Sequence, residues 1–145
     1  QLEFLKNNLK GYELNINFLG KLNKEDVENK ISNADFLIHV EGSEFYIKEK
    51  TKFSISTKIP ECLSSGKPLI AYGPDDIASM KLIYENELGL FLNSQDTDQD
   101  IILKITDFIF DEQAVSNSIS NGFYYAKQNF SIKKIQENLI DMIEG

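Results

Sequence analysis

The chain has 145 residues, 41% of them hydrophobic and 26% charged, and a formal net charge of −8. This size and composition suit one globular domain with a core of its own, while the acidic charge argues against nucleic acid as a partner. No apolar run approaches the ~20 residues that cross a bilayer, residues 1–10 lack the pattern of a signal peptide, and the single cysteine, Cys62, excludes an internal disulfide, so we expect a cytoplasmic protein.

Four short segments predict β-strands. Leu14 to Leu19 alternates apolar and polar residues, which is typical of a strand at the edge of a sheet. Phe36 to Val40 and Pro68 to Tyr72 are continuous apolar runs, the pattern of strands that are covered on both faces in a parallel sheet. Gly89 to Leu92 is the fourth predicted strand.

Apolar residues at helical spacing occupy the intervals between these segments. Asn23 is placed to cap the first helix, and either Asp75 or Asp76 is placed to open the next. Thr97 and Asp100 form a pattern like a capping box for a further helix. Because strands and helices alternate, the sequence predicts an α/β fold with a Rossmann-like, doubly wound parallel sheet and right-handed crossovers.

After the last predicted strand the periodicity stays helical. One helix is expected around Val115 to Gln128, and Ser131 is expected to cap a last amphipathic helix. We therefore treat residues 1–145 as one domain whose closing helices occupy about residues 112–144.

Ligands of such sheets bind beyond the carboxyl ends of the strands. The turns at those ends are Gly20 to Asn23, Glu41 to Phe53, and Gly73 to Asp76. The middle one mixes aromatic residues with lysines, which suits either a mobile loop near an anionic ligand or a merely solvated loop. His39, just before it, is expected to be a buried histidine with its hydrogen bonds satisfied rather than a ligand or a base.

The run SISTKIPECLSSGKPLIAYG, residues 54–73, is the most informative part of the chain, because it joins a hydroxyl-rich turn, a short helix and a buried strand. Three hydroxyl residues are placed to cap that helix: Ser54, Ser56 and Thr57. Lys58 adds positive charge to a helix start that favours anions, and Glu61 lies about one turn further on. A phosphate at the helix start and a diol at Glu61 would fit a nucleotide, whereas Lys58 and Glu61 could also form only a surface ion pair.

A metal site is not expected. Asp96, Asp98 and Asp100 imitate the start of a calcium loop, but Ile101 stands where that loop requires glycine. Helix capping accounts for all three carboxylates.

Several of these segments resemble the C-terminal, nucleotide-sugar-binding domain of retaining glycosyltransferases of the GT-B fold, the group 1 type that builds bacterial capsular and other surface polysaccharides. STKIPECLSSGKPLIAYG is similar to the donor-binding block of that family, written "K..EYLa.GKPiia". NINFLGKLNKEDVENKISNADFLIHVEG is similar to its strand, glycine turn and following helix, and GLFLNSQDTDQDIILKITDFIFD and YYAKQNFSIKKIQENLIDMI resemble its last strand and closing helices.

This resemblance implies a hexosyltransferase whose donor is a UDP-sugar or a GDP-sugar. Glu61 would accept hydrogen bonds from both ribose hydroxyls. The other implied donor contacts are Ser56, Thr57 and Lys58 at the diphosphate and Gly20 and Leu22 at the base. Lys58 and the helix dipole would stabilise the leaving group, so no metal and no other cofactor is implied.

The chain departs from the family in two respects. Phe53 occupies the position of a glutamate that meets the donor sugar in many relatives, so that contact is expected from Glu41, Ser43 or Glu44. Two central strands of the family's domain also have no counterpart. The resemblance therefore implies a fragment that lacks the N-terminal acceptor domain, does not catalyse transfer alone, and closes its sheet differently or borrows strands from a second copy.

Two hypotheses of different classes follow. The first is the donor-binding part of a glycosyltransferase that acts on a glycan or a lipid-linked acceptor, in the cytoplasm or at the inner face of the membrane. The second is a non-catalytic α/β module whose exposed helix and edge strand bind a protein. An upstream Rossmann-like half in the same gene would favour the first.

Overall fold

The computed structural model describes residues 16–131, which form an α/β fold around a parallel sheet. Within that range the sheet has three strands, β1 (Leu37–Val40), β2 (Leu69–Gly73) and β3 (Leu90–Asn93), in the order β1-β2-β3. The α/β class and the strands predicted from the three apolar runs are confirmed. Each strand begins one residue later than the sequence predicts.

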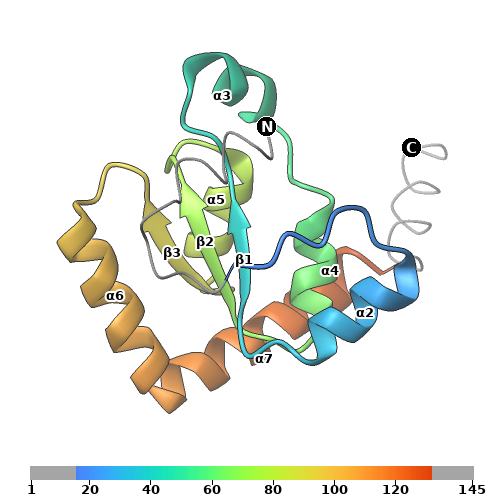
Figure 1. The fold of residues 1–145 in the computed structure, drawn as a ribbon. Coiled ribbons are helices and arrows are strands. Elements are labelled where there is room, and N and C mark those ends of the chain that lie inside the picture. Colours follow the sequence, from blue (N-terminus) through green and yellow to red (C-terminus); the bar gives the residue numbers. More distant parts are fainter. Residues whose placement is uncertain (1–15, 132–145) are drawn as a thin grey trace, which may run out of the picture.

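Six helices occur in the described part of the chain. They are α2 (Lys24–Ser32), α3 (Phe45–Thr51), α4 (Lys58–Ser64), α5 (Ala78–Glu85), α6 (Asp98–Phe110) and α7 (Glu112–Asn129). Figure 1 shows α3 beyond the carboxyl ends of the strands, α6 beside β3, and α7 running past the opposite ends. None of the helices within residues 16–131 has both the length and the apolar character that a membrane crossing requires.

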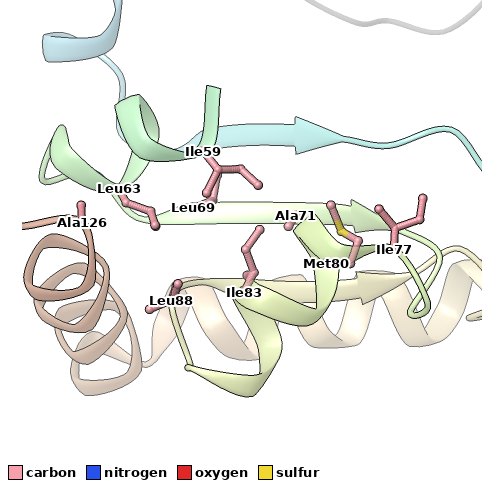
Figure 2. Packing of buried hydrophobic residues seen from close by; sticks show 9 residues of the cluster. All are labelled: Ile59, Leu63, Leu69, Ala71, Ile77, Met80, Ile83, Leu88 and Ala126. Carbon is pink, nitrogen blue, oxygen red and sulfur yellow. The ribbon is translucent and has the colours of Figure 1, made fainter. Parts of the chain in front are cut away.

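The core lies on one face of the sheet, where β2 meets α4 and α5 (Figure 2). Alternate residues of a strand share a face, so Leu69 and Ala71 both point toward Ile59 of α4 and Met80 of α5. All four are almost completely buried. The whole cluster consists of Ile59, Leu63, Leu69, Ala71, Ile77, Met80, Ile83, Leu88 and Ala126. This core fixes α4, the helix of the predicted site, against the central strand.

Two helix starts are built as the sequence predicts. The side-chain oxygen of Asn23 accepts a hydrogen bond from the N–H of Asp26 at 2.9 Å, at the start of α2. At the start of α6, Thr97 accepts from the N–H of Asp100, and the Asp100 carboxylate accepts from the N–H of Thr97. Each cap supplies a partner to an N–H group that has none inside the helix.

The predicted edge strand is wrong in its described part. Ile16 to Leu19 forms neither helix nor strand, and its apolar side chains are largely exposed. A strand needs a neighbour for its backbone hydrogen bonds, and among the described residues β1 pairs only with β2. Leu14, and the last helix predicted after Ser131, lie outside the described residues.

Two further predictions are wrong at the carboxyl ends of the strands. Neither Asp75 nor Asp76 caps α5, because the residue before that helix is Ile77, which has extended backbone and makes no capping bond with its side chain. The loop predicted for residues 41–53 contains α3. The segment 45–51 has no glycine or proline to interrupt a helix, and packing against the β2–α5 turn holds it.

Candidate functional site

The turn before α4 is fixed by a buried serine rather than by capping. Thr57 stands at the N-cap of α4, but its side chain makes no capping hydrogen bond, so the predicted caps at Ser54, Ser56 and Thr57 are wrong. Instead, the N–H of Ser56 donates to the hydroxyl of Ser79 at 2.9 Å, and that hydroxyl donates to the carbonyl of Ser54 at 3.2 Å. Ser79 is fully buried in α5. The turn is therefore tied to the core through both hydrogen bonds of one hydroxyl.

The start of α4 leaves backbone donors free. Within the described part of the chain, the N–H groups of Thr57 and Lys58 have no hydrogen-bond partner, and both residues are exposed. Helix starts leave such donors unpaired, and Lys58 adds a full positive charge next to them. This edge of the molecule can therefore contact an anion, although α4 is only seven residues long and its dipole is correspondingly small.

Glu61 lies at a cavity between two helices. Its side chain is exposed on α4 and borders a cavity of about 310 Å³ that α2 closes from the other side. The lining residues are Glu28, Ile31 and Ser32 of α2, Glu61 and Ser64 of α4, and Ser65 just after it. Carboxylate and hydroxyl oxygens on both walls can accept hydrogen bonds from a ligand rich in hydroxyl groups.

The α2 wall of this cavity was not predicted from the sequence. Glu28 and Ser32 are four residues apart, as are Glu61 and Ser65, so each pair lies on one face of its helix. This spacing in the sequence predicts one polar face on α2 and one on α4. The contact between these two faces could not be predicted, because residues 33–57, with β1 and α3, separate α2 from α4.

The other predicted site residues do not line the same cavity. Gly20 has a positive φ of 70° in the segment that leads into α2, and Leu22 is half-buried just before that helix. Ser56, Thr57 and Lys58 precede Glu61 by five residues or fewer. The structure thus brings Glu61 to α2. The residues predicted for the base precede α2 in the chain, and those predicted for the diphosphate precede Glu61.

Cys62, beside Glu61, packs against the core cluster. Burial raises the pKa of its thiol, the charge of Glu61 raises it further, and Lys58 partly opposes that rise. A thiol with a raised pKa is protonated at neutral pH and is a poor nucleophile. Cys62 therefore acts as a packing residue of α4 rather than as a reactive group.

Two carboxylate contacts lie at the carboxyl ends of β1 and β2. His39 of β1 is buried, and its Nε2 lies 3.0 Å from Oε1 of Glu41. This contact confirms the expected satisfied histidine. Nζ of Lys48 in α3 lies 2.7 Å from Oδ2 of Asp76, and the hydrogen bond from Lys48 lowers the pKa of Asp76. Both contacts fix segments at the end of the sheet where ligands of parallel sheets bind.

The described residues contain no group of three or more histidine, cysteine, aspartate or glutamate side chains that could hold a metal ion. The polar groups that the candidate site residues present are carboxylate, hydroxyl, ammonium and backbone N–H groups, all of which can contact a polar ligand.

Comparison with known proteins places the chain in a family. A search of curated proteins found no match. A comparison with protein families matches residues 2–132 to the glucosyltransferase 3-like, C-terminal domain. This match covers nearly the whole chain and supports the expectation of a glycosyltransferase-related transferase, at the level of a glucosyltransferase C-terminal domain. With its α/β fold and a match over almost its full length, the chain belongs to the glucosyltransferase 3-like, C-terminal domain family.

Proposed function

We propose that this chain is the donor-binding part of a hexosyltransferase, which moves a sugar from a nucleoside diphosphate sugar to a glycan or a lipid-linked acceptor. The membership in a glucosyltransferase C-terminal domain family supports this proposal. The described strands would form part of a Rossmann-like, doubly wound sheet of a retaining GT-B enzyme of the bacterial polysaccharide-building type. The acceptor would bind to an N-terminal domain outside this chain, in the cytoplasm or at the inner face of the membrane.

One observation carries the proposal most directly: the exposed carboxylate of Glu61 borders a cavity and is not locked into an interior contact. A carboxylate accepts both hydroxyls of a ribose diol in a bidentate, charge-assisted contact. In this proposal Glu61 binds the ribose. The remaining donor contacts are Ser56, Thr57 and Lys58 at the diphosphate and Gly20 and Leu22 at the base.

Lys58 would also assist the reaction. When the bond between the sugar and the diphosphate breaks, negative charge grows on the leaving phosphate. The ammonium of Lys58 and the free N–H groups at the start of α4 would stabilise that charge without a metal ion. In this proposal the donor site works without metal or other cofactor.

Calorimetry with UDP, GDP, UDP-glucose and GDP-glucose tests the proposal. We expect one base to bind, and Glu61→Gln to weaken that binding by roughly 10- to 100-fold, because a hydrogen bond to a charged group contributes about 1.5–3 kcal/mol. Glu112→Gln is the matched control, because Glu112 is an exposed carboxylate of α7 away from the cavity. No heat with any nucleotide, or equal affinity in the Glu61→Gln variant, would contradict the proposal.

A second candidate, a non-catalytic protein-binding module, rests on a different observation. Ile38 and Val40 of β1 are 70% and 61% exposed. Exposed apolar residues on a strand at the edge of the described sheet suit pairing with another chain, including strand exchange with a second copy. Two results would favour this candidate: concentration-dependent association in ultracentrifugation, and no binding heat with any of the four nucleotides.

A further inference from the structure

A hydrogen bond between a histidine and a glutamate lies largely buried at the carboxyl end of β1. His39 and Glu41 are only 7% and 12% exposed, and Nε2 of His39 lies 3.0 Å from Oε1 of Glu41. Because an ionised carboxylate only accepts hydrogen bonds, the ring nitrogen is the donor. Glu41 directly follows β1, and its N–H donates to the carbonyl of Tyr72. The extended backbone therefore continues past Val40 and places both side chains on the side of α4 and α5. The pair therefore fixes the direction of the Glu41 carboxylate.

The second oxygen of this carboxylate is available. Within residues 16–131, Oε2 of Glu41 accepts no hydrogen bond from the protein. Oε2 is not fully buried either. In that range, the side-chain atom that is both fully buried and without a hydrogen-bond partner is Oδ1 of Asp76, not an atom of Glu41. Glu41 thus presents one oriented acceptor oxygen to solvent at the ligand-binding end of the sheet.

Stability alone is a weak reason for this arrangement. Taking a carboxylate out of water carries a desolvation penalty that can exceed the gain from its contact with a buried partner, so the contact is weak evidence of net stability. A carboxylate with an open oxygen is better explained by a ligand that donates to it. Sugar hydroxyl groups are such donors.

Glu41 also lies in the same neighbourhood as the start of α4. A Cβ added at Gly73 would lie 3.1 Å from Cβ of Glu41 and 3.3 Å from Sδ of Met80, so both side chains lie next to Gly73. Ser79, the residue before Met80, holds the turn before α4 through Ser56. Gly73 therefore lies between Glu41 and Met80 of α5, and the residue before Met80 holds the turn where the diphosphate is proposed to bind.

We propose that Glu41 binds hydroxyl groups of the donor sugar and that His39 is its positioning residue. The inference rests on the proposed donor site, since it places the sugar beyond a diphosphate at the start of α4. Glu61 then binds the ribose of the nucleotide, and Glu41 makes the affinity for a nucleoside diphosphate sugar higher than that for the nucleoside diphosphate alone.

The test compares UDP with UDP-glucose, and GDP with GDP-glucose, by calorimetry in the intact chain. Glu41→Gln should weaken the binding of the sugar nucleotide by at least about tenfold, because it removes a charged acceptor that contacts the sugar. The affinity for the nucleoside diphosphate should stay unchanged, because that ligand has no sugar at this position. His39→Ala should give the same selective loss. His39→Gln should restore part of it, because the glutamine amide can donate in place of the ring.

Glu112→Gln is again the matched control, because Glu112 is an exposed carboxylate of α7 from which no sugar contact is expected. Glu41→Asp, which keeps the charge but withdraws the oxygen, serves as the second variant if Glu41→Gln does not fold. Equal losses for both ligands, no loss, or the same selective loss in Glu112→Gln would overturn the role of Glu41. In each of these cases a loss of nucleoside diphosphate binding in Glu61→Gln would still support the donor site, so the two failures are distinguishable.

Discussion

At the scale of the residue, the carboxylate of Asp76 connects two segments that are distant in sequence. Its Oδ2 lies 2.7 Å from Nζ of Lys48, while its Oδ1 is buried without a partner in the described part of the chain. The contact holds α3 against the turn between β2 and α5. Because the hydrogen bond from Lys48 lowers the pKa of Asp76, the folded state favours the ionised form.

This shift predicts a dependence of stability on pH. A carboxyl group whose pKa is lower in the folded state stabilises that state above its unfolded pKa, about 4 for aspartate. The contribution is lost as the pH falls through the folded pKa. We therefore expect Asp76→Asn to lower the urea midpoint at pH 7, and the difference from the unmodified chain to shrink from about pH 4 downward.

Asp75→Asn provides the comparison, because Asp75 is exposed and forms no ion pair within residues 16–131. Its urea midpoint should follow the unmodified chain at every pH. A difference for Asp76→Asn that stays constant down to pH 2 would show that the ion pair does not titrate as proposed.

At the scale of the element, α6 depends on the capping box at its start. The hydroxyl of Thr97 and the carboxylate of Asp100 each accept from the other residue's backbone N–H. Thr97→Ala removes one of these partners, so we expect it to lower the free energy of unfolding by about 1 kcal/mol. Urea unfolding followed by circular dichroism measures this change.

Thr106→Ala controls for the loss of a hydroxyl in the same helix. The Thr106 hydroxyl bonds to the Ile102 carbonyl one turn earlier and to no other group within residues 16–131, and alanine has the higher helix propensity. The stability of this variant should equal or slightly exceed that of the unmodified chain. Equal losses in both variants would mean that the capping box is not what stabilises α6.

At the scale of the whole molecule, α7 joins the described C-terminal part to the helix of the candidate site. Its buried residues are small and recur every four positions, at Ser118, Gly122 and Ala126. This stripe lets α7 approach α4 closely, and a Cβ added at Gly122 would lie 3.1 Å from Cδ2 of Leu63. The position of Glu61 therefore depends on packing between helices that are far apart in sequence.

Leu63→Ala should weaken this contact. Leu63 is 3% exposed, and truncating a buried leucine removes its apolar contacts and leaves a cavity, so we expect a loss of about 2–5 kcal/mol in the free energy of unfolding. Leu103→Ala, at an exposed position of α6, should change it by less than about 0.5 kcal/mol. Similar small effects of both substitutions in urea unfolding would exclude the α4–α7 contact as a main source of stability.

The sequence by itself determined the features that depend on neighbours in the chain. The apolar runs that became β1, β2 and β3 are local patterns, and so are the caps at Asn23 and Thr97, because a cap and its N–H group lie three residues apart. Glu61 was predicted as an exposed polar residue of a short helix for the same reason. The burial of His39 was predicted from its place in an apolar run, although its partner Glu41 was not.

The tertiary structure alone decided what joins distant segments. It placed Glu28 and Ser32 of α2 across a cavity from Glu61, and it replaced the predicted caps before α4 with two hydrogen bonds to Ser79 of α5. It also made a helix of residues 45–51, which is held to the turn before α5 by the ion pair of Lys48 with Asp76. The secondary-structure propensity of a short segment is weak. Where two segments could bond to the same polar groups, burial and packing therefore determine which bond forms.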